Sequence, residues 1–455
     1  MRGKRELSGW SASAAIGLLV LTSAAAPQTH RQTGQNDLTG RLQKAFDSAK
    51  TDFDAPNLSA GVWIGNEVVL AAWFARDADA PEEALDHARP APWTFEALSA
   101  LALLRMADAG KLKLSDAVTK HLPQLEFGGK TVTIAQVLTH SSGAPSYADY
   151  LETNDEVRDS AAVLSWLGKR PLDAEPGSCF VYSESNALIA AAIAEKLAEA
   201  PIQKVLQEWV IDPARLQNTA VEVGERERRP REASFSVSGA PADAASVGRL
   251  FGVVDIRTSL DDLAHLMRAL EGVFLTDSSR ATLLAADRLS GGIEAPYSYG
   301  FSRTRLESEP FLSLGGASRA SALRVSWRPA TSLVVASAAG RESVNLARIN
   351  ERLARVVFEI PERKVVDLPL TKEQCAVYTG VYYMGCTRTT IEARDEQLFF
   401  ESPFDGPYRL RHQGEHRFVS EPDDEVIFEF KVDSGVASEF VLNRHGARTG
   451  AMRMK

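Results

Sequence analysis

The segment from Thr94 to Gly110, TFEALSALALLRMADAG, most constrains the fold of this chain. It predicts a helix with apolar residues on all sides, closed by a glycine turn. A helix of this kind is stable only when other elements surround it. The sequence therefore predicts a large core with this helix buried inside it.

Size and charge are those of a globular protein. The chain has 455 residues, 44% of them hydrophobic and 24% charged, which is enough for two or three domains. Its net charge is -9, and its basic residues form no run beyond the mixed stretch 225–231, which we interpret as a solvated loop. We therefore expect no nucleic-acid partner.

Residues 1–26 resemble a secretory signal peptide. A basic start precedes an apolar stretch from Ala14 to Leu21, and small residues follow from Ala24 to Ala26. We expect the protein to be exported, to the periplasm or the medium, with an uncleaved membrane anchor as the alternative. Since no other stretch approaches the roughly 18 apolar residues of a membrane helix, we expect no span in the mature chain.

The pattern from residue 37 to residue 360 predicts an α/β (α+β) domain. An amphipathic helix over 37–53 is followed by a hairpin over 58–75, and helices dominate from 95 to about 275. Strands over 309–340, with a turn at Arg328 and Pro329, precede a closing helix over 345–360. This order predicts a mixed sheet flanked by helices, with a helical insert.

A second domain is predicted at 366–455, where short β runs alternate with turn residues. It contains two of the three cysteines, Cys375 and Cys386, whose proximity allows a disulfide outside the cytoplasm. Cys179 would then be a small buried hydrophobe.

Four segments carry a family resemblance: residues 107–147, which end in VLTHSSGAPSY, 176–199, 257–270 and 297–302. They resemble the serine β-lactamase-related family, which includes class C β-lactamases, penicillin-binding-protein-like carboxypeptidases and esterases. The resemblance covers roughly residues 40–358, and the tail resembles the lipocalin-like domains often appended to such enzymes. It implies a β-lactamase/transpeptidase-like fold and a serine hydrolase site. That site consists of Ser-x-x-Lys on a buried helix, a Tyr-x-Asn loop and a Lys- or His-x-Gly strand.

The resemblance places the serine at Trp93 and the lysine at Glu96, so the catalytic pair is missing. No lysine in the chain has a serine three positions before it, so a shifted alignment does not restore the motif. In the second motif Tyr182 is kept, and Glu184 replaces the asparagine unless a shift in register brings in Asn186.

The third motif aligns Ser313 with the lysine or histidine and keeps Gly315 and Gly316. The charge that would hold a substrate carboxylate is thereby lost, although Arg319 could supply one from the following turn. We thus expect Trp93, Glu96, Glu184, Ser313, Gly315 and Arg319 to line the cleft, with Tyr182 as the retained catalytic position.

Trp93 and Glu96 also have structural interpretations. If Thr94 caps the helix, Trp93 can pack on Leu98 as a hydrophobic staple, while Glu96 lies where the helix dipole favours an anion. The sharper alternative is that Glu96, Glu184 and Tyr182 line a remodelled pocket for a cationic or sugar-like ligand, or form an acid–base pair of carboxylates.

Two further residues have side chains that could take part in catalysis. Ser99, one turn after Glu96, could be a displaced nucleophile, but its apolar surroundings favour packing. His140 is expected to be structural. The histidines predict no metal site, and we expect no cofactor.

These observations predict an exported β-lactamase-related pseudoenzyme with a binding or scaffolding role, because losing nucleophile and base together abolishes acyl transfer. The expected partners are a small-molecule or cell-wall-like ligand in the cleft and a protein on the C-terminal domain. The alternative is an active hydrolase of peptides, esters or β-lactams that uses a non-standard residue set around Tyr182.

Overall fold

The protein is described here by a computed structural model. It describes residues 28–76, 84–91, 93–147, 160–223, 251, 253–290, 294–307, 309–318, 321–402, 405–444 and 447–454. The predicted signal peptide, the stretch 225–231 and Arg319 lie outside these residues. Among the described helices, none combines the length and apolarity needed to cross a bilayer.

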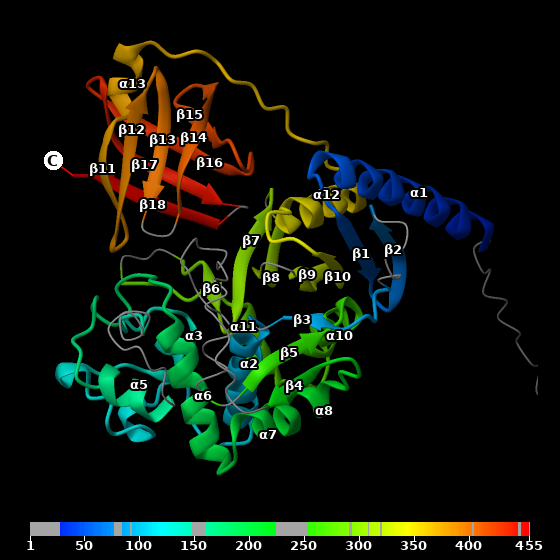
Figure 1. The fold of residues 1–455 in the computed structure, drawn as a ribbon, viewed down its shortest axis with the longest axis vertical. Helices are drawn as coiled ribbons and strands as arrows, with labels where there is room; N and C mark the ends of the chain where they lie inside the picture. Colours follow the sequence, from blue (N-terminus) through cyan, green and yellow to red (C-terminus); the bar gives the residue numbers. More distant parts are fainter. Residues whose placement is uncertain are drawn as a thin grey trace, which may run out of the picture.

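A seven-stranded antiparallel sheet forms the centre of the first domain, in the order β2-β1-β10-β9-β8-β7-β6 (Figure 1). The predicted hairpin is confirmed, with its turn at Gly65 and Asn66. The strands are β1 Asn57–Ile64, β2 Glu67–Ala75, β6 Tyr297–Ser298, β7 Phe301–Leu306, β8 Glu309–Ser318, β9 Ser321–Arg328 and β10 Leu333–Ala339.

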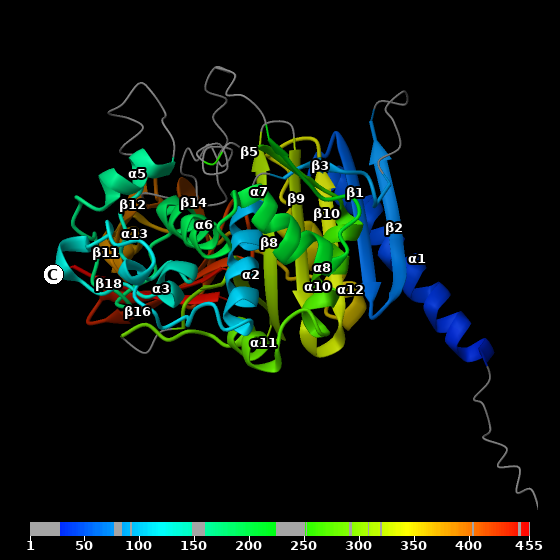
Figure 2. The same ribbon diagram turned by 90° about the horizontal axis from the view of Figure 1, so that it is seen from below.

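Helices cover both faces of this sheet (Figure 2). On one face lie α1 (Gln28–Asp52) and α12 (Leu346–Phe358), which contact each other and bury one apolar cluster against the strands. On the other face lie α2 (Thr94–Asp108) and α10 (Leu260–Glu271) within a second, larger cluster. The predicted sheet flanked by helices is therefore confirmed, and its described strand pairs are all antiparallel.

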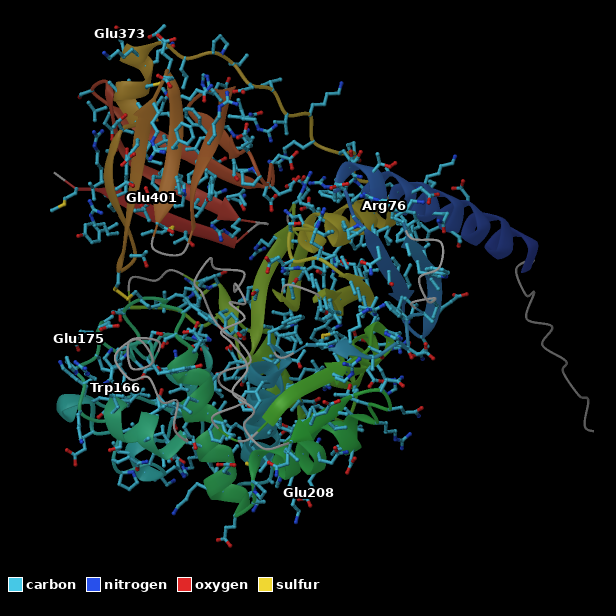
Figure 3. The ribbon with its side chains drawn as sticks, viewed as in Figure 1. Arg76, Trp166, Glu175, Glu208, Glu373 and Glu401 are labelled. Carbon is cyan, nitrogen blue, oxygen red and sulfur yellow. A yellow bond between two sulfur atoms is a disulfide. The ribbon has the colours of Figure 1, made fainter. Side chains whose placement is uncertain are left out.

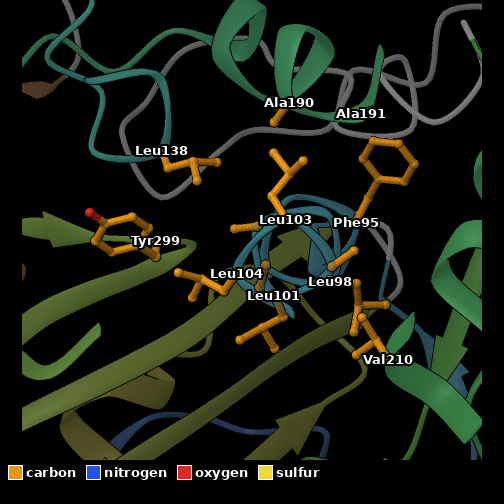
Figure 4. Close-up of a cluster of buried hydrophobic side chains, with 14 of the residues drawn as sticks. Phe95, Leu98, Leu101, Leu103, Leu104, Leu138, Ala190, Ala191, Val210 and Tyr299 are labelled. Atoms are coloured by element: carbon orange, nitrogen blue, oxygen red, sulfur yellow. The ribbon is translucent and has the colours of Figure 1, made fainter. Parts of the chain in front are cut away.

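Helix α2 is buried nearly all round, as its composition predicts. In Figure 4 its side chains, among them Leu101 and Leu104, are surrounded by Leu138, Ala190 and Tyr299 from other parts of the chain. Packing on all sides leaves this helix no freedom to shift. The residues of its first turn are therefore held in fixed positions.

The helical insert completes the first domain. A small sheet, in the order β3-β5-β4, lies beside it. The elements are α3 Ile134–Leu138, α5 Ser160–Leu167, α6 Glu184–Ala198, α7 Ile202–Leu206, α8 Asp212–Ala214, α11 Asp277–Leu284, β3 Arg89–Pro90, β4 Ala220–Val223 and β5 Val253–Thr258.

The C-terminal part is a closed eight-stranded antiparallel barrel with the short helix α13 (Lys372–Tyr378) against it (Figure 1). Its interior is filled mainly by aromatic side chains, among them Phe400, Phe428 and Phe440. The strands are β11 Gly380–Met384, β12 Thr387–Arg394, β13 Gln397–Ser402, β14 Asp405–Gly414, β15 Arg417–Ser420, β16 Val426–Asp433, β17 Val436–Arg444 and β18 Ala447–Arg453.

A disulfide joins the two domains. It links Cys179, in the loop before α6, to Cys386 in the β11–β12 turn, and is the yellow bond between the barrel and the insert in Figure 3. The bridge between Cys375 and Cys386 that their proximity in sequence allows is therefore not formed. Cys375 lies on α13, buried and free, because its side chain belongs to the core of the barrel.

Charged side chains form a second link between the domains. Arg348 of α12 pairs with Asp424 at 2.5 Å and with Glu425 at 3.0 Å, both in the segment between β15 and β16. Arg355, about two turns further along α12, reaches Glu425 at 3.1 Å. The side chains of Arg355 and Glu425 are 5% and 7% exposed, so these charges are largely removed from water.

The disulfide assignment predicts the thiol count. Protein prepared under oxidising conditions and denatured without reductant should expose one reactive thiol, that of Cys375, and three after reduction. The Cys386→Ser variant should lose about 2–5 kcal/mol of unfolding free energy, because the tether closes a separation of 207 residues. Cys375→Ala is the matched control, and an equal loss in both variants would contradict the tether.

The interface also predicts a pH dependence. Burial raises the pKa of Glu425 from 4.5 to about 6, with help from the charge of Glu351 and against the arginines nearby. Between these values the native state holds more protons than the unfolded state, so this group makes stability fall as pH rises. In the Glu425→Gln variant the melting temperature should therefore fall less between pH 4.5 and 6.5 than in the parent protein. An equal fall in both proteins would contradict this role of Glu425.

Candidate functional site

The first turn of α2 carries the two residues that replace the expected catalytic pair. Trp93 directly precedes the helix and already has helical angles, with φ -67° and ψ -16°. No side chain caps the helix, and the Thr94 hydroxyl instead donates to Ala91 O at 2.7 Å. The predicted Thr94 cap is therefore wrong, because this hydroxyl is committed to the turn that leads into α2.

Glu96 accepts hydrogen bonds from three side chains. His140 Nε2 lies 2.6 Å from Oε1, Tyr297 OH donates to Oε1 at 2.5 Å, and Tyr182 OH donates to Oε2 at 3.1 Å. Burial alone would raise the pKa of Glu96, but attraction to His140 and these hydrogen bonds hold it below its ordinary value. The site is thus built around an ionised carboxylate.

His140 has both ring nitrogens engaged. Its Nδ1 accepts from the Ser183 backbone N–H at 3.2 Å and from Asn186 Nδ2 at 3.0 Å, so Nε2 carries the proton donated to Glu96. The side chain is 1% exposed, and the backbone has φ 51°, which is costly for a residue other than glycine. The surrounding contacts hold His140 in this conformation, and no ring nitrogen is left to act as a base.

The two tyrosines are held in the same way. Tyr182 stacks on the His140 ring with centroids 4.4 Å apart, and Tyr297 meets it edge-on at 4.7 Å. Burial, followed by the charge of Glu96, raises the pKa of both hydroxyls well above the ordinary tyrosine value. Both therefore stay protonated and act as donors.

Trp93 lies against strand β8. A Cβ on Gly316 would come 2.6 Å from Trp93 Cγ, so only glycine leaves room for this indole. The neighbouring residue on the same face is Leu314, which belongs to the core around α2. In the described part of the strand this face bears no charged side chain.

Ser313 and Gly315 lie on the opposite face of β8. The Ser313 hydroxyl donates to Ser326 Oγ at 3.2 Å and lines a pocket beside α12. Side chains alternate along a strand, so Gly315 shares that face. The structure therefore does not bring Ser313 and Gly315 to the cleft, and the predicted alignment is shifted by one residue from the face that meets Trp93.

The remaining predicted residues surround this cluster. Glu184, at the start of α6, accepts from Ser146 Oγ at 3.3 Å, and burial raises its pKa. Asn186 accepts from Ser142 Oγ at 2.6 Å as it donates to His140. Ser99 donates to Phe95 O at 2.7 Å within the core, which matches its expected packing role.

The described residues contain no group of three metal-binding side chains. His412 and His416, four apart in the barrel, do not converge on one point. His416 Nδ1 pairs with Tyr378 OH at 2.8 Å, and His412 stacks on Phe418.

Comparison with known proteins settles the family. The family profile described as Beta-lactamase matches residues 42–356, more than half of the chain. The chain belongs to the beta-lactamase family. The expected resemblance and the predicted fold class are thereby confirmed.

Solved structures show the same fold. SurE, crystallised with D-Leu, has a TM-score of 0.59 at 16% identity, over 92% of this chain and 100% of that one. The octameric penicillin-binding protein homologue from Pyrococcus abyssi has a TM-score of 0.58 at 16% identity, over 90% and 99%. A class C beta lactamase from Rhodobacter sphaeroides, at 0.55 and 16%, covers 70% of this chain and 99% of its own.

Curated relatives match a shorter stretch. Protein flp of Staphylococcus aureus (strain MW2) is 25% identical over 182 residues, 38% of this chain and 36% of that protein. N-acetylmuramyl-L-alanine amidase of Bacillus subtilis (strain 168) is 27% identical over 143 residues, 29% and 32% of the two chains. The match thus spans about a third of the length of these relatives.

Sequence reasoning missed two central residues of the site. His140 was assigned a structural role, and Tyr297 stood in a quoted segment without a role. One signal could have found them: a buried carboxylate at Glu96 requires hydrogen-bond donors, and both residues lie in segments that carry the family resemblance.

Replacing Glu96 tests this arrangement. Glu96→Ala leaves three buried donors without their acceptor and should lower the unfolding free energy by about 3–5 kcal/mol in urea titrations. The matched control is Glu184→Gln, which should change it by less than about 1 kcal/mol because burial already favours the uncharged form. Similar losses in both variants would contradict the central role of Glu96.

Proposed function

We propose that this chain is a catalytically inactive member of the beta-lactamase family, which binds a ligand or partner rather than hydrolysing a substrate. One observation carries the proposal: the Glu96 carboxylate takes the hydrogen bonds of Tyr182, Tyr297 and His140. Among the described residues around it, the groups that could accept a proton from a nucleophile are already engaged.

Acyl transfer needs a nucleophile with a base within hydrogen-bond reach. The position aligned with the serine holds Trp93, whose indole packs on Gly316. Tyr182 offers a hydroxyl, but its pKa lies far above neutrality because of burial and the nearby charge of Glu96. These features speak against the alternative of an active hydrolase built around Tyr182.

The cleft ligand we propose is derived from the cell wall. The relatives include an N-acetylmuramyl-L-alanine amidase and a penicillin-binding protein homologue, which supports this class. A disulfide between domains suits an oxidising compartment, which supports export. On the barrel, Tyr383 and Met452 are cross-strand neighbours with 40% and 59% exposure, and we propose this patch as the protein-binding surface.

Covalent labelling tests the absence of catalysis. Folded protein is incubated with a fluorophosphonate probe and with a penicillin, and its intact mass is measured beside an active serine hydrolase of the family. We expect no added mass, since no described hydroxyl in the cleft has a free base. An adduct mapped to a cleft serine would overturn the proposal. So would an adduct mapped to Tyr182 that is absent in the Tyr182→Phe variant.

A further inference from the structure

A second pocket lies on the other face of the central sheet, between strands β7, β8 and β9 and helix α12. The pocket is open to solvent, and the empty space of about 350 Å³ between its walls includes solvent at its mouth. Its walls are formed by Thr304, Arg305, Leu306, Phe311, Ser313, Arg324, Ser326, Ala347, Asn350, Glu351 and Ala354. The sheet separates it from Glu96, so this inference does not depend on the proposed function.

The alternation of side chains along β9 places the guanidinium of Arg324 in this pocket. Leu323 and Val325 of β9 belong to the core around α2, so Arg324 and Ser326 face α12. Arg324 is half-buried, and its Nε is buried without a hydrogen-bond partner. The ion pairs of the described residues include none with its guanidinium. Burial lowers the pKa of Arg324 to about 10, which leaves it charged at neutral pH.

A charge that is partly removed from water in this way is normally paired. The acids nearest to Arg324 are committed to other arginines: Glu351 accepts from Arg355 Nε at 2.8 Å, and Asp423 lies 3.9 Å from Arg348 Nε. Asp423 attracts Arg324 only from beyond ion-pair range. The pocket therefore holds a positive charge that the described residues do not neutralise.

Ser326 supplies a second donor beside Arg324. Its oxygen accepts from Ser313 Oγ at 3.2 Å and from Asn350 Nδ2 at 3.3 Å, and its own proton has no acceptor among the described residues. Asn350 is itself fixed, since it also donates to Val335 O at 3.1 Å. The hydroxyl is thus preorganised as a donor next to the guanidinium.

The remaining wall is mostly apolar, with Leu306 and Phe311 from the strands and Ala347 and Ala354 from α12. Two further charged side chains line the pocket, and both are paired: Arg305 with Glu294 at 3.8 Å and Glu351 with Arg355 at 2.8 Å. The guanidinium of Arg324, the Ser326 donor and the apolar side chains then match a monoanion with a short hydrocarbon chain. We propose that this pocket binds the carboxylate of a short aliphatic acid, held by Arg324 and Ser326, with its chain against the apolar wall.

Calorimetric titration of the full chain at pH 7 and constant ionic strength tests the proposal. Butyrate should bind saturably, and butyramide, the uncharged analogue, should not. Arg324→Met should weaken butyrate binding about tenfold or more, because it removes a charged hydrogen bond. Arg388→Met, which removes the same charge from an exposed position on the barrel, should leave binding unchanged.

Stability measurements separate a binding role of Arg324 from a structural one. Without ligand, Arg324→Met should melt no lower than the parent protein, since it replaces an unpaired buried charge by an apolar chain. With butyrate, it should lose the rise in melting temperature that the parent protein shows. Ser326→Ala, a smaller change, should weaken binding several-fold.

Four outcomes would overturn the proposal: no saturable binding of butyrate, equal binding of butyramide, unchanged affinity in both Arg324→Met and Ser326→Ala, or equal losses in Arg324→Met and Arg388→Met. Inorganic phosphate provides a further comparison. If phosphate binds more tightly than butyrate, the pocket selects a compact oxyanion and the assignment to an aliphatic acid is wrong.

Discussion

The carboxylate of Glu96 determines the arrangement of the whole cleft. Three donors from separate segments, His140, Tyr182 and Tyr297, converge on its two oxygens. An ammonium group at the same point, as the family resemblance implies for position 96, would offer protons where this carboxylate accepts them. Reversing the charge therefore reverses the hydrogen-bond roles of its neighbours, and the tyrosines and the imidazole become its donors rather than groups that could receive a proton.

Successive side chains on the strands of the central sheet point to opposite faces, so one strand contributes residues to both sides. On β8, Gly316 makes room for Trp93 on the α2 side, and Ser313 points toward α12. On β9, Val325 packs in the core around α2, and Arg324 lines the pocket on the other side. Because the period is two residues, an alignment shifted by one moves a side chain from one site to the other. The register decides whether a polar residue faces the Glu96 side of the sheet or the pocket beside α12.

Local patterns were sufficient for the fold. The all-round apolar stretch predicts α2, and the turn residues predict the β1–β2 hairpin, because each pattern reports on neighbouring residues. The contacts that define the site join residues far apart in the chain: 44 positions between Glu96 and His140, 201 between Glu96 and Tyr297. The disulfide joins two cysteines that are 207 positions apart in the sequence. Such pairings depend on how elements pack, so the nearby Cys375 and Cys386 were a misleading guide.

The barrel is connected to both faces of the sheet through two different contacts. Cys386 holds the segment that begins at Cys179, which three residues later supplies Tyr182 and then the Ser183 amide bound to His140. Glu425 is held by arginines of α12, the helix that also lines the Arg324 pocket. One contact fixes the loop above the Glu96 cluster and the other fixes the helix beside the second pocket. A shift of the barrel would therefore move elements of both sites, although none of the barrel's described residues lines the pocket or bonds to Glu96.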